Sequence, residues 1–574
     1  MQFALIAQQK LTGIVTGTGG LPLSGATVAV KGKDSAVTTN VGGSFTITVT
    51  AGDVLLFSFI GYATRQVKPG NETTLRISLS ESTINLDEIV VTGYTSQKIK
   101  EITGSVAVVK PKDLTDIPAG QVEQMLQGRV AGLNVITSGM PGSPSNVRLH
   151  GIGNFGDVTP LYIIDGVQGD INSLNPYDIE LIQVLKDASA YSIYGVRGAN
   201  SVIIIATKKG KTSRTKVSYD FYMNTTRPLN YGNDLLNPQE QADLTWIALR
   251  NSGKPNPSHL LYGNGINPVI PDYFIAGINT GLSANDPLAD TSRYNIDFTV
   301  GPINQIVASK KTDTDLFHEL FKPAFSHSHS LSVSGANKKN KYFLSFGYLD
   351  QQGATLYTYL KRFTIMVNTQ FSVNDKIRIG ENLQLSYRDN PLTCAEFGGP
   401  VDNDIFKSVL AYKVLPVYDI KGSWAHFIAR NFWENPVAMR TIAKDNITRY
   451  WEVAGNAFAE IDLLNHFTAR TNSGGNLINY YFNKFNFYGY DSLGTGLPDN
   501  SLTESSGYRQ SWTWTNTLKF SQNIGDDHHL NVLVGIEVVD NYNREVGDNK
   551  IDFYTNDVNY LFLANGGQKT AQVT

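Results

Sequence analysis

Residues 363–387 read FTIMVNTQFSVNDKIRIGENLQLSY, two halves joined at Asn374-Asp375. Apolar residues fill most odd positions of both halves and polar residues most even ones, and in the second half Glu381 is the one exception. Because successive side chains of a β-strand point to opposite faces, this stretch predicts two antiparallel strands with one apolar and one polar face. Alternation over about ten residues is typical of strands that cross an outer membrane between lipid and a polar lumen.

The same alternation recurs outward from this stretch, at Val217–Asn224 and Ser511–Phe520. It predicts nine strands, near 214–226, 325–335, 341–350, 359–373, 376–388, 447–462, 466–476, 508–522 and 528–540. The connections after the even-numbered strands are tight turns, whereas those after the odd-numbered strands are longer, and 227–324 and 389–446 are the longest. Bacterial barrels have short periplasmic turns and long extracellular loops. Residues 212–574 are therefore predicted to be strands of an antiparallel transmembrane β-barrel.

Composition agrees with a mostly β protein. Charged residues make up 17% of the 574 residues, below the roughly 25% of ordinary soluble domains, and the chain has 28 Tyr, 27 Phe and 52 Gly. A net charge of −3 gives no support for nucleic-acid binding. The single cysteine, Cys394, cannot form an internal disulfide. The longest apolar stretch, near 54–63, is shorter than the ~20 residues of a helical membrane span.

Two further segments precede the barrel strands. Short strands separated by glycine turns over residues 10–80 predict a β-sandwich, and residues 1–9 are either a disordered start or the remainder of a signal peptide. Residues 101–211 mix strand patterns with helical ones over 120–130 and 187–194, which predicts an α/β domain. The intervening linker, 81–100, holds a β-branched run that is either an edge strand or a strand that a partner captures by adding it to a sheet.

No pattern in the sequence points to catalysis. His327 and His329 share one strand face, but no further ligand is spaced to complete a metal site, and packing at a membrane interface is the better interpretation. Gly151–Gly156 fits G-x-G-x-x-G, yet another strand follows it instead of the helix that a dinucleotide site needs. The sequence thus predicts no enzyme activity, no cofactor and no metal, and it leaves the substrate-binding residues unknown.

Several motifs resemble those of the SusC/RagA family of TonB-dependent outer-membrane transporters from Bacteroidetes, and the resemblance extends over about 10–540. The motifs are FSFIGY at 57–62, DEIVVTGY at 87–94, LQGRVAG at 126–132, PLYIIDG at 160–166, VLKDAS at 184–189, IYGVRGAN at 193–200 and TKKG at 207–210. The chain departs from the family pattern at His150, where a second arginine is usual, and at Asn40, where aspartate is usual.

The resemblance implies roles for individual segments. Residues 10–80 would be a carboxypeptidase-regulatory-like sandwich and 101–211 the plug. The TonB box would be Asp87, Glu88, Ile89, Val90, Val91, Thr92, Gly93 and Tyr94. The plug signature would consist of Gly128, Arg129, Gly132, Arg148, Gly151, Asp165, Gly166, Lys186, Asp187, Tyr194, Gly195, Arg197, Gly198 and Asn200.

The resemblance also implies active import of a glycan or oligopeptide across the outer membrane, gated by the plug. The N-terminal domain and TonB box would be periplasmic, and TonB, with ExbB and ExbD, would supply energy from the proton gradient. A SusD-like surface lipoprotein would cover loops 227–324 and 389–446, where Trp424, Trp433 and Tyr418 could contact a sugar. Two alternatives remain, a ligand sensor that relays to an anti-sigma factor and a surface binding protein without transport.

The strand count leads to a further expectation. Transporters of this kind close a barrel of about 22 strands, whereas nine are found. The sequence is therefore expected to be the N-terminal portion of such a transporter, and its strands are expected to form an open, curved sheet that partly surrounds the plug.

Overall fold

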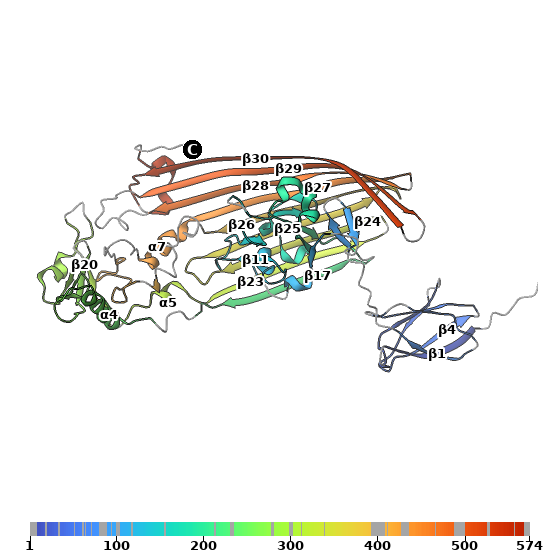
Figure 1. Cartoon of the computed structure of the whole chain (residues 1–574), viewed down its shortest axis with the longest axis horizontal. Coiled ribbons are helices and arrows are strands. Elements are labelled where there is room, and N and C mark those ends of the chain that lie inside the picture. The colour runs from blue at the N-terminus through green and yellow to red at the C-terminus, as the bar shows by residue number, and fades with distance from the viewer. Residues whose placement is uncertain are drawn as a thin grey trace, which may run out of the picture. The chain divides into compact units, whose positions relative to one another are not determined.

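The computed structural model describes residues 8–567 with gaps, of which the larger are 80–88, 392–407, 426–434 and 487–499 and the others span one to five residues. The chain divides into two compact units, Met1–Ile102 and Thr103–Thr574, both drawn in Figure 1. Each unit is described by itself.

The first unit is a sandwich of two sheets, with strand orders β4-β1-β7 and β3-β2-β5-β6. Alternate residues of its strands point inward, as Phe45, Ile47 and Val49 do in β4, and the rings of Phe45 and Phe57 meet edge to face at 5.4 Å. The predicted β-sandwich is confirmed, although its first strand begins at Gln8, inside the segment expected to be a disordered start. The strands are β1 (Gln8–Thr16), β2 (Thr27–Val30), β3 (Ala36–Thr38), β4 (Ser44–Thr50), β5 (Leu55–Ser58), β6 (Arg65–Val67) and β7 (Thr74–Ser78).

The second unit begins with a compact α/β segment, the predicted plug. Its sheet has the order β10-β15-β16-β13-β14, and a hairpin of β11 and β12 lies beside it. The helix expected over 120–130 is wrong in its extent, because α2 ends at Met125 and the chain then turns at Gly128, which has a φ of 72°. The elements are β10 (Val106–Val109), α1 (Pro111–Thr115), α2 (Val122–Met125), β11 (Leu133–Ile136), β12 (Asn146–Leu149), β13 (Leu161–Ile164), β14 (Val167–Gln168), β15 (Ile179–Leu185), α3 (Ala188–Tyr191) and β16 (Val202–Thr207).

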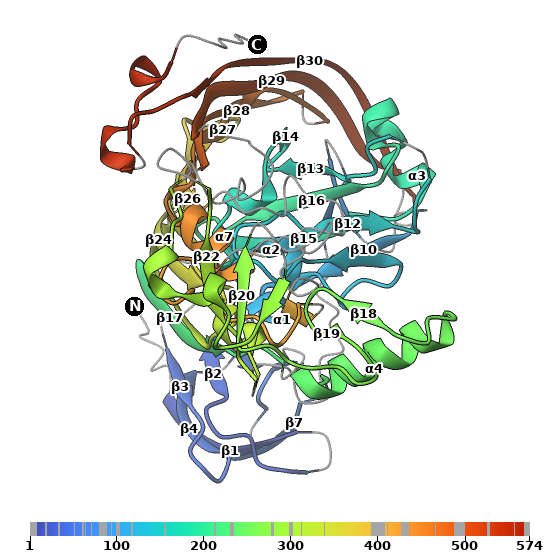
Figure 2. The ribbon, with the colours of Figure 1, turned by 90° about the vertical axis from the view of Figure 1, so that its left-hand side faces the viewer.

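Nine strands form one antiparallel sheet in sequence order, from β17 at one edge to β30 at the other, as predicted. Figure 2 shows that the sheet curves around the plug, with the plug strands on its concave side. Strands β28 to β30 extend well beyond their predicted ends, because the backbone ladder continues where the alternation fades. The strands are β17 (Lys216–Thr226), β23 (Ala324–Ala336), β24 (Asn340–Gln352), β25 (Tyr359–Ser372), β26 (Ile377–Asn390), β27 (Ile447–Leu463), β28 (Phe467–Asn486), β29 (Ser501–Ile524) and β30 (His528–Ile551).

The two faces of this sheet differ in polarity. Apolar side chains such as Leu344 and Ile365 are exposed on the convex face, whereas polar side chains such as Ser330 and Asn368 are buried on the concave face, against the plug. Glu381 interrupts the apolar face, and its carboxylate accepts a hydrogen bond from the Thr369 hydroxyl. The alternation in the sequence therefore gives the sheet an apolar convex face and a polar concave face.

An aromatic row crosses six neighbouring strands near the ends that lead into the long connections. The residues stand directly opposite one another in register, and neighbouring ring centroids are 4.7–6.4 Å apart. Aromatic belts of this kind lie at the interfaces of membrane β-barrels, and His329 belongs to this row rather than to a ligand set. The row consists of Phe221, His329, Tyr348, Phe363, Tyr387 and Trp451.

The two longest connections fold together into a loop subdomain, which comprises the described residues of 235–323 and 408–445. Trp246 and Tyr262 from the first connection share a core with Val414 and Leu415 from the second. Its elements include α4 (Pro238–Asn251), β20 (Tyr273–Ala276), β21 (Thr280–Leu282), β22 (Gln305–Ala308), α5 (Leu316–Leu320) and α7 (Pro436–Ile442). Among the described residues, no helix is both long and apolar enough to cross a membrane.

Gly210 lies where the plug leads into the wall, against the backbone of β23 and β24. We expect its replacement to prevent the plug from packing correctly against the wall. A Cβ at this position would lie 1.9 Å from the Gly335 carbonyl oxygen and 2.7 Å from that of Tyr342, and backbone atoms cannot move aside. Overpacking of this kind costs about 1–3 kcal/mol. Gly210→Ala should make the plug sensitive to protease in isolated membranes, whereas Gly153→Ala, where a Cβ meets nothing within 4 Å, should not. Equal protease resistance of the two variants would contradict this expectation.

Candidate functional site

The plug meets the inner wall along a polar seam, formed by plug residues 165–178 and the wall side chains that they contact. The seam reaches four wall strands, β23, β25, β26 and β27. Its hydrogen bonds run from Asn175 Nδ2 to Ser330 Oγ (2.9 Å), from Arg362 to the Asn172 carbonyl (2.9 Å), from Gln384 Nε2 to Ser173 Oγ (2.8 Å) and from Asn456 Nδ2 to the Asp165 carbonyl (3.3 Å).

Turn chemistry explains why the seam folds as it does. Asp165 and Gly166 have φ values of 47° and 95°, as the tight two-residue hairpin between β13 and β14 requires. Asp165 holds this strained conformation because its carboxylate accepts a hydrogen bond from the Thr207 backbone N–H at 3.2 Å. Asp170 and Asn175 then cap two short 3₁₀ helices by accepting from backbone N–H groups. The caps direct their side chains and those of the following residues toward the wall.

One ion pair joins the plug to the wall at the centre of the seam. An Arg388 amino group lies 2.7 Å from an Asp170 carboxylate oxygen, and the two side chains are 14% and 25% exposed. Glu452, buried on β27, is a further acid near this pair. Removing one partner of a buried pair leaves an uncompensated charge, which typically costs 3–5 kcal/mol. The plug and the wall are therefore joined here by a partly buried ion pair that holds only while both partners are present.

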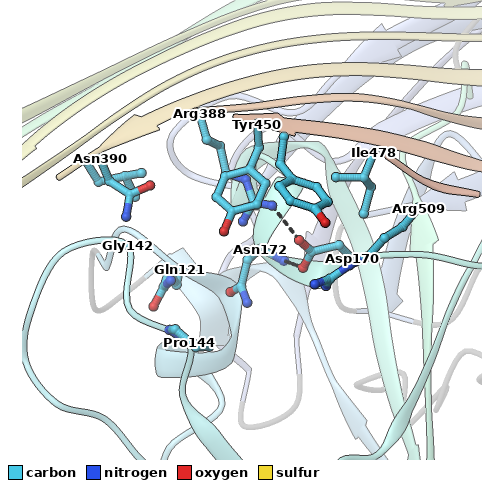
Figure 3. A pocket seen from close by; sticks show the side chains of 12 residues that line it. Gln121, Gly142, Pro144, Asp170, Asn172, Arg388, Asn390, Tyr450, Ile478 and Arg509 are labelled. Atoms are coloured by element: carbon cyan, nitrogen blue, oxygen red, sulfur yellow. Dashed lines mark hydrogen bonds and ion pairs between the residues drawn. The ribbon is translucent and has the colours of Figure 1, made fainter. Parts of the chain in front are cut away.

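A cavity of about 250 Å³ opens beside this ion pair. Figure 3 shows the Asp170 carboxylate facing Arg388 and Arg509. The Arg388 guanidinium lies 4.8 Å from the centre of the Tyr450 ring, and that of Arg509 lies 5.4 Å from the centre of the Tyr480 ring. Plug residues Gln121, Gly142, Pro144, Asp170 and Asn172 line the cavity together with wall residues Leu360, Arg388, Asn390, Tyr450, Ile478, Tyr480 and Arg509.

The cavity lies on the side of the plug that faces the long connections. Asn390 ends β26 and Tyr450 lies near the start of β27, and residues 391–446 connect these two strands. Charged, amide and aromatic groups converge on it, which is typical of a binding site for a polar ligand. We therefore take this cavity as the candidate ligand site.

Asp178 is a further ionisable group in the seam, and burial raises the pKa of its carboxyl from 3.8 to about 7. Asp220 raises the pKa further, while Lys208 and Arg362 oppose the shift. Because the raised pKa belongs to the folded state, Asp178 contributes stability that is complete below about pH 4 and is lost as the pH rises to about 7.

Asp178→Asn should remove this pH dependence. We expect the melting temperature of the variant, relative to the wild type, to be higher at pH 8 than at pH 5, as measured by thermal unfolding of the full chain. Asp375→Asn, in a tight turn far from the seam, is the control and should give the same difference at both pH values. The same pH dependence in Asp178→Asn and the wild type would contradict the prediction.

Only part of the predicted TonB box falls on described residues. Ile89–Thr92 form β8, which pairs antiparallel with β9 (Thr95–Lys98). Asp87, Glu88, Gly93 and Tyr94 lie outside the described residues. The strand that the sequence predicts to be capturable is thus paired with the residues that follow it.

Most predicted plug-signature residues hold turns. Gly128, Gly132, Gly151, Gly166 and Gly195 all have positive φ values, which glycine adopts without strain. Gly198 is packed closely, since a Cβ there would lie 3.0 Å from the Tyr191 carbonyl oxygen. Gly132 lies near Gly151, because the backbone N–H of His150, the residue before Gly151, donates to the Gly132 carbonyl at 2.9 Å.

The polar signature residues mostly stabilise the plug itself. Asp187 caps α3, and hydrogen bonds from the backbone N–H groups of Ser105 and Ala190 hold the pKa of its carboxyl below the usual value. Arg197 reaches the wall, where it pairs with Glu537 of β30 at 2.5 Å. The remaining members bond within the plug or are buried in it: Arg129, Arg148, Asp165, Lys186, Tyr194 and Asn200. None of the signature residues lines the cavity.

The residues around the cavity were not predicted, and the aromatic loop residues that were named lie elsewhere. Tyr418 and Trp424 stack on each other at 4.8 Å within the loop subdomain, and Trp433 and Cys394 lie outside the described residues. The available signal was the polar face of the strands, which places Arg388 and Tyr450 on the inner wall. Sequence alone could not tell which of these inner positions meets Asp170. In the described part of the chain, no three His, Cys, Asp or Glu residues gather as a metal site would require.

Family models match two parts of this chain. The TonB-dependent Receptor Plug Domain matches residues 98–202, and the CarboxypepD_reg-like domain matches residues 11–91. These matches coincide with the α/β segment inside the sheet and with the sandwich.

Similarity to curated proteins extends further. TonB-dependent receptor P3 of Formosa agariphila is 29% identical over 99% of this chain and 51% of its own length. TonB-dependent receptor P26 of the same organism is 28% identical over 93% of this chain and 49% of its own length. TonB-dependent receptor SusC of Bacteroides thetaiotaomicron is 30% identical over 75% of this chain and 39% of its own length. The chain thus spans about half the length of the first two.

Solved structures show the same fold. The RagAB peptide importer in its "open-open" state superposes with a TM-score of 0.67 over 85% of this chain and 53% of the other, at 24% identity. Its "closed-closed" state gives a TM-score of 0.64 over 82% and 52%, at 23% identity. The chain thus carries matches to a TonB-dependent receptor plug domain and a CarboxypepD_reg-like domain, and over most of its length it is similar to curated TonB-dependent receptors, SusC among them.

Proposed function

We propose that this chain takes part in TonB-dependent import of an oligosaccharide or oligopeptide across a bacterial outer membrane. The observation that carries the proposal is the polar seam, because hydrogen bonds and ion pairs hold the plug against a polar inner wall whose opposite face is apolar. A polar interface between two folded parts can separate at lower cost than an apolar core, since water can replace its hydrogen bonds. A plug that blocks a pore at rest and must yield during transport needs such an interface.

The energy for this movement would come from TonB, with ExbB and ExbD, driven by the proton gradient of the inner membrane. TonB would pair with the box at 87–94 as an added strand, which uses main-chain hydrogen bonds and tolerates β-branched side chains. The sandwich and the box would then be periplasmic, and the loop subdomain would be extracellular.

A SusD-like lipoprotein would cover the loop subdomain and close over a bound ligand. The subdomain supports this role because it is a folded structure with its own cores rather than a set of independent loops. RagAB, whose fold this chain shares, is a peptide importer, which supports a peptide as the cargo here, and an oligosaccharide is the second candidate.

Uptake in living cells tests the proposal. Cells that carry the protein should accumulate fluorescent oligopeptides or oligosaccharides in the periplasm, and accumulation should stop when a protonophore collapses the gradient. Binding at the cell surface should persist under the same treatment. Accumulation that continues without the gradient would show passive diffusion and overturn the proposal.

A further inference from the structure

Two arginines of the inner wall, Arg388 and Arg509, line the cavity beside the plug. Arg388 forms its ion pair with Asp170 through one amino group, and its Nε is buried without a hydrogen-bond partner among the described residues. Arg509 makes no hydrogen bond or ion pair with any described residue, and its guanidinium lies over the Tyr480 ring. The two arginines therefore have N–H donors beside the cavity that no acceptor of the plug uses.

The carboxylate of Asp170, a plug residue, is the anion that pairs with Arg388 of the wall. One of its carboxylate oxygens accepts from the Asn172 backbone N–H at 2.8 Å, and the other meets Arg388. Figure 3 shows the Asp170 carboxylate joined to Arg388, with Arg509 among the other residues that line the cavity. The geometry is that of an anion site whose occupant is part of the protein.

We infer that the cavity binds a carboxylate group of the transported ligand, which replaces Asp170 as the ion-pair partner of Arg388, is also bound by Arg509, and so detaches this corner of the plug. The inference rests on the proposed function and names the ligand chemistry and the contact through which binding loosens the plug. The carboxylate could belong to the C-terminus of a peptide or to a uronic acid of a glycan.

The charges around the cavity permit this exchange. Glu452 lies near Arg388, and Glu545, which accepts from the Ser505 hydroxyl, lies near Arg509. Glu452 already lies near Asp170, so a ligand carboxylate in the same place meets the same neighbour. One carboxylate replaces another, so the net charge of the site is unchanged, and the spare donors of both arginines favour a ligand that can engage them in bidentate fashion.

Binding to the purified full chain tests the inference without transport. The probes are a fluorescent hexapeptide with a free C-terminus and its amidated form, and tetragalacturonate and its methyl ester. Wild type should bind at least one free carboxylate probe and should bind its blocked form about tenfold more weakly, because a charge-assisted hydrogen bond is lost. The probe that binds identifies the source of the carboxylate.

Three variants assign the contacts. Arg509→Gln should weaken binding of the free probe about tenfold. Asp170→Asn, which removes the competing charge and keeps the shape, should strengthen it. Arg470→Gln is the matched control, since Arg470 also lies over an aromatic ring, that of Phe458, but outside the cavity. Hydrogen exchange of residues 165–178 should rise when the free probe binds and in Asp170→Asn.

The opposite results are equally definite. Equal binding of free and blocked probes, unchanged binding in Arg509→Gln, or no binding of either free probe at millimolar concentration would overturn the inference. If uptake fails while these binding results hold, the proposed transport is wrong and the carboxylate site stands. If uptake is driven by the gradient but these binding results fail, the transport proposal stands alone.

Discussion

Proline at Val90 and Val91 should reduce uptake to the background of cells that lack the protein. Both residues lie in β8, which pairs with β9 along one edge, so in an alternating ladder one of two successive N–H groups points to the other edge. A captured strand binds its partner through these main-chain donors. Proline removes the donor and fixes φ near −65°, so the double substitution should prevent strand addition without altering the plug or the wall.

The measurement compares accumulation and surface binding of the same fluorescent ligand. Deletion of 87–94 should give the same loss of accumulation, and surface binding should persist in both variants. Val91→Ile is the matched control, because it keeps the donor and the β-branched side chain. Accumulation at the wild-type level in the proline variant would show that TonB does not act through this segment.

A disulfide between the plug and the wall should stop uptake reversibly. Asn175 of the plug and Ser330 of β23 are suitable positions, since their side chains are joined by a hydrogen bond of 2.9 Å and are buried. In a Cys394→Ser background, which removes the only natural cysteine, Asn175→Cys with Ser330→Cys should cross-link under oxidation. The plug would then be tied to the wall at the seam and could not yield to a pull from TonB.

Reduction of the disulfide distinguishes a plug that is held in place from a protein that has misfolded. Accumulation should be at background in oxidised cells and should return after treatment with dithiothreitol, and each single cysteine variant should behave the same under both conditions. A disulfide shown to be complete by gel mobility, together with undiminished accumulation, would mean that the plug passes ligand without moving at this seam.

Much of the architecture could be predicted from the sequence because it depends on local patterns. Period-two alternation and the sorting of short and long connections predicted the nine strands and their order, since each strand pairs with its neighbour along the chain. The hairpin at Asp165-Gly166 was not predicted, although Asp-Gly is one of the pairs that favour positive φ values at both positions of a two-residue turn. By contrast, the helix over 120–130 was too long, since side-chain periodicity does not report where a backbone turns at Gly128.

The two longest connections show a second limit of prediction from the sequence. Residues 227–324 and 389–446 read as two separate loops, yet Trp246 packs in one core with Val414 and Leu415. Contacts between residues so distant in sequence leave no periodic signal in either segment. The same reason explains why stacked Tyr418 and Trp424 could be mistaken for free aromatic residues.

The sequence by itself determined the family, the sandwich, the plug and the strands with their two unlike faces, because motifs and alternation are properties of neighbouring residues. Only the tertiary structure decided that Asp170 meets Arg388 beside Arg509 and that a cavity opens there. These residues come from a plug turn and from two strands, brought together by the curvature of the sheet around the plug. A site built across such distances depends on that curvature, which no stretch of sequence specifies alone.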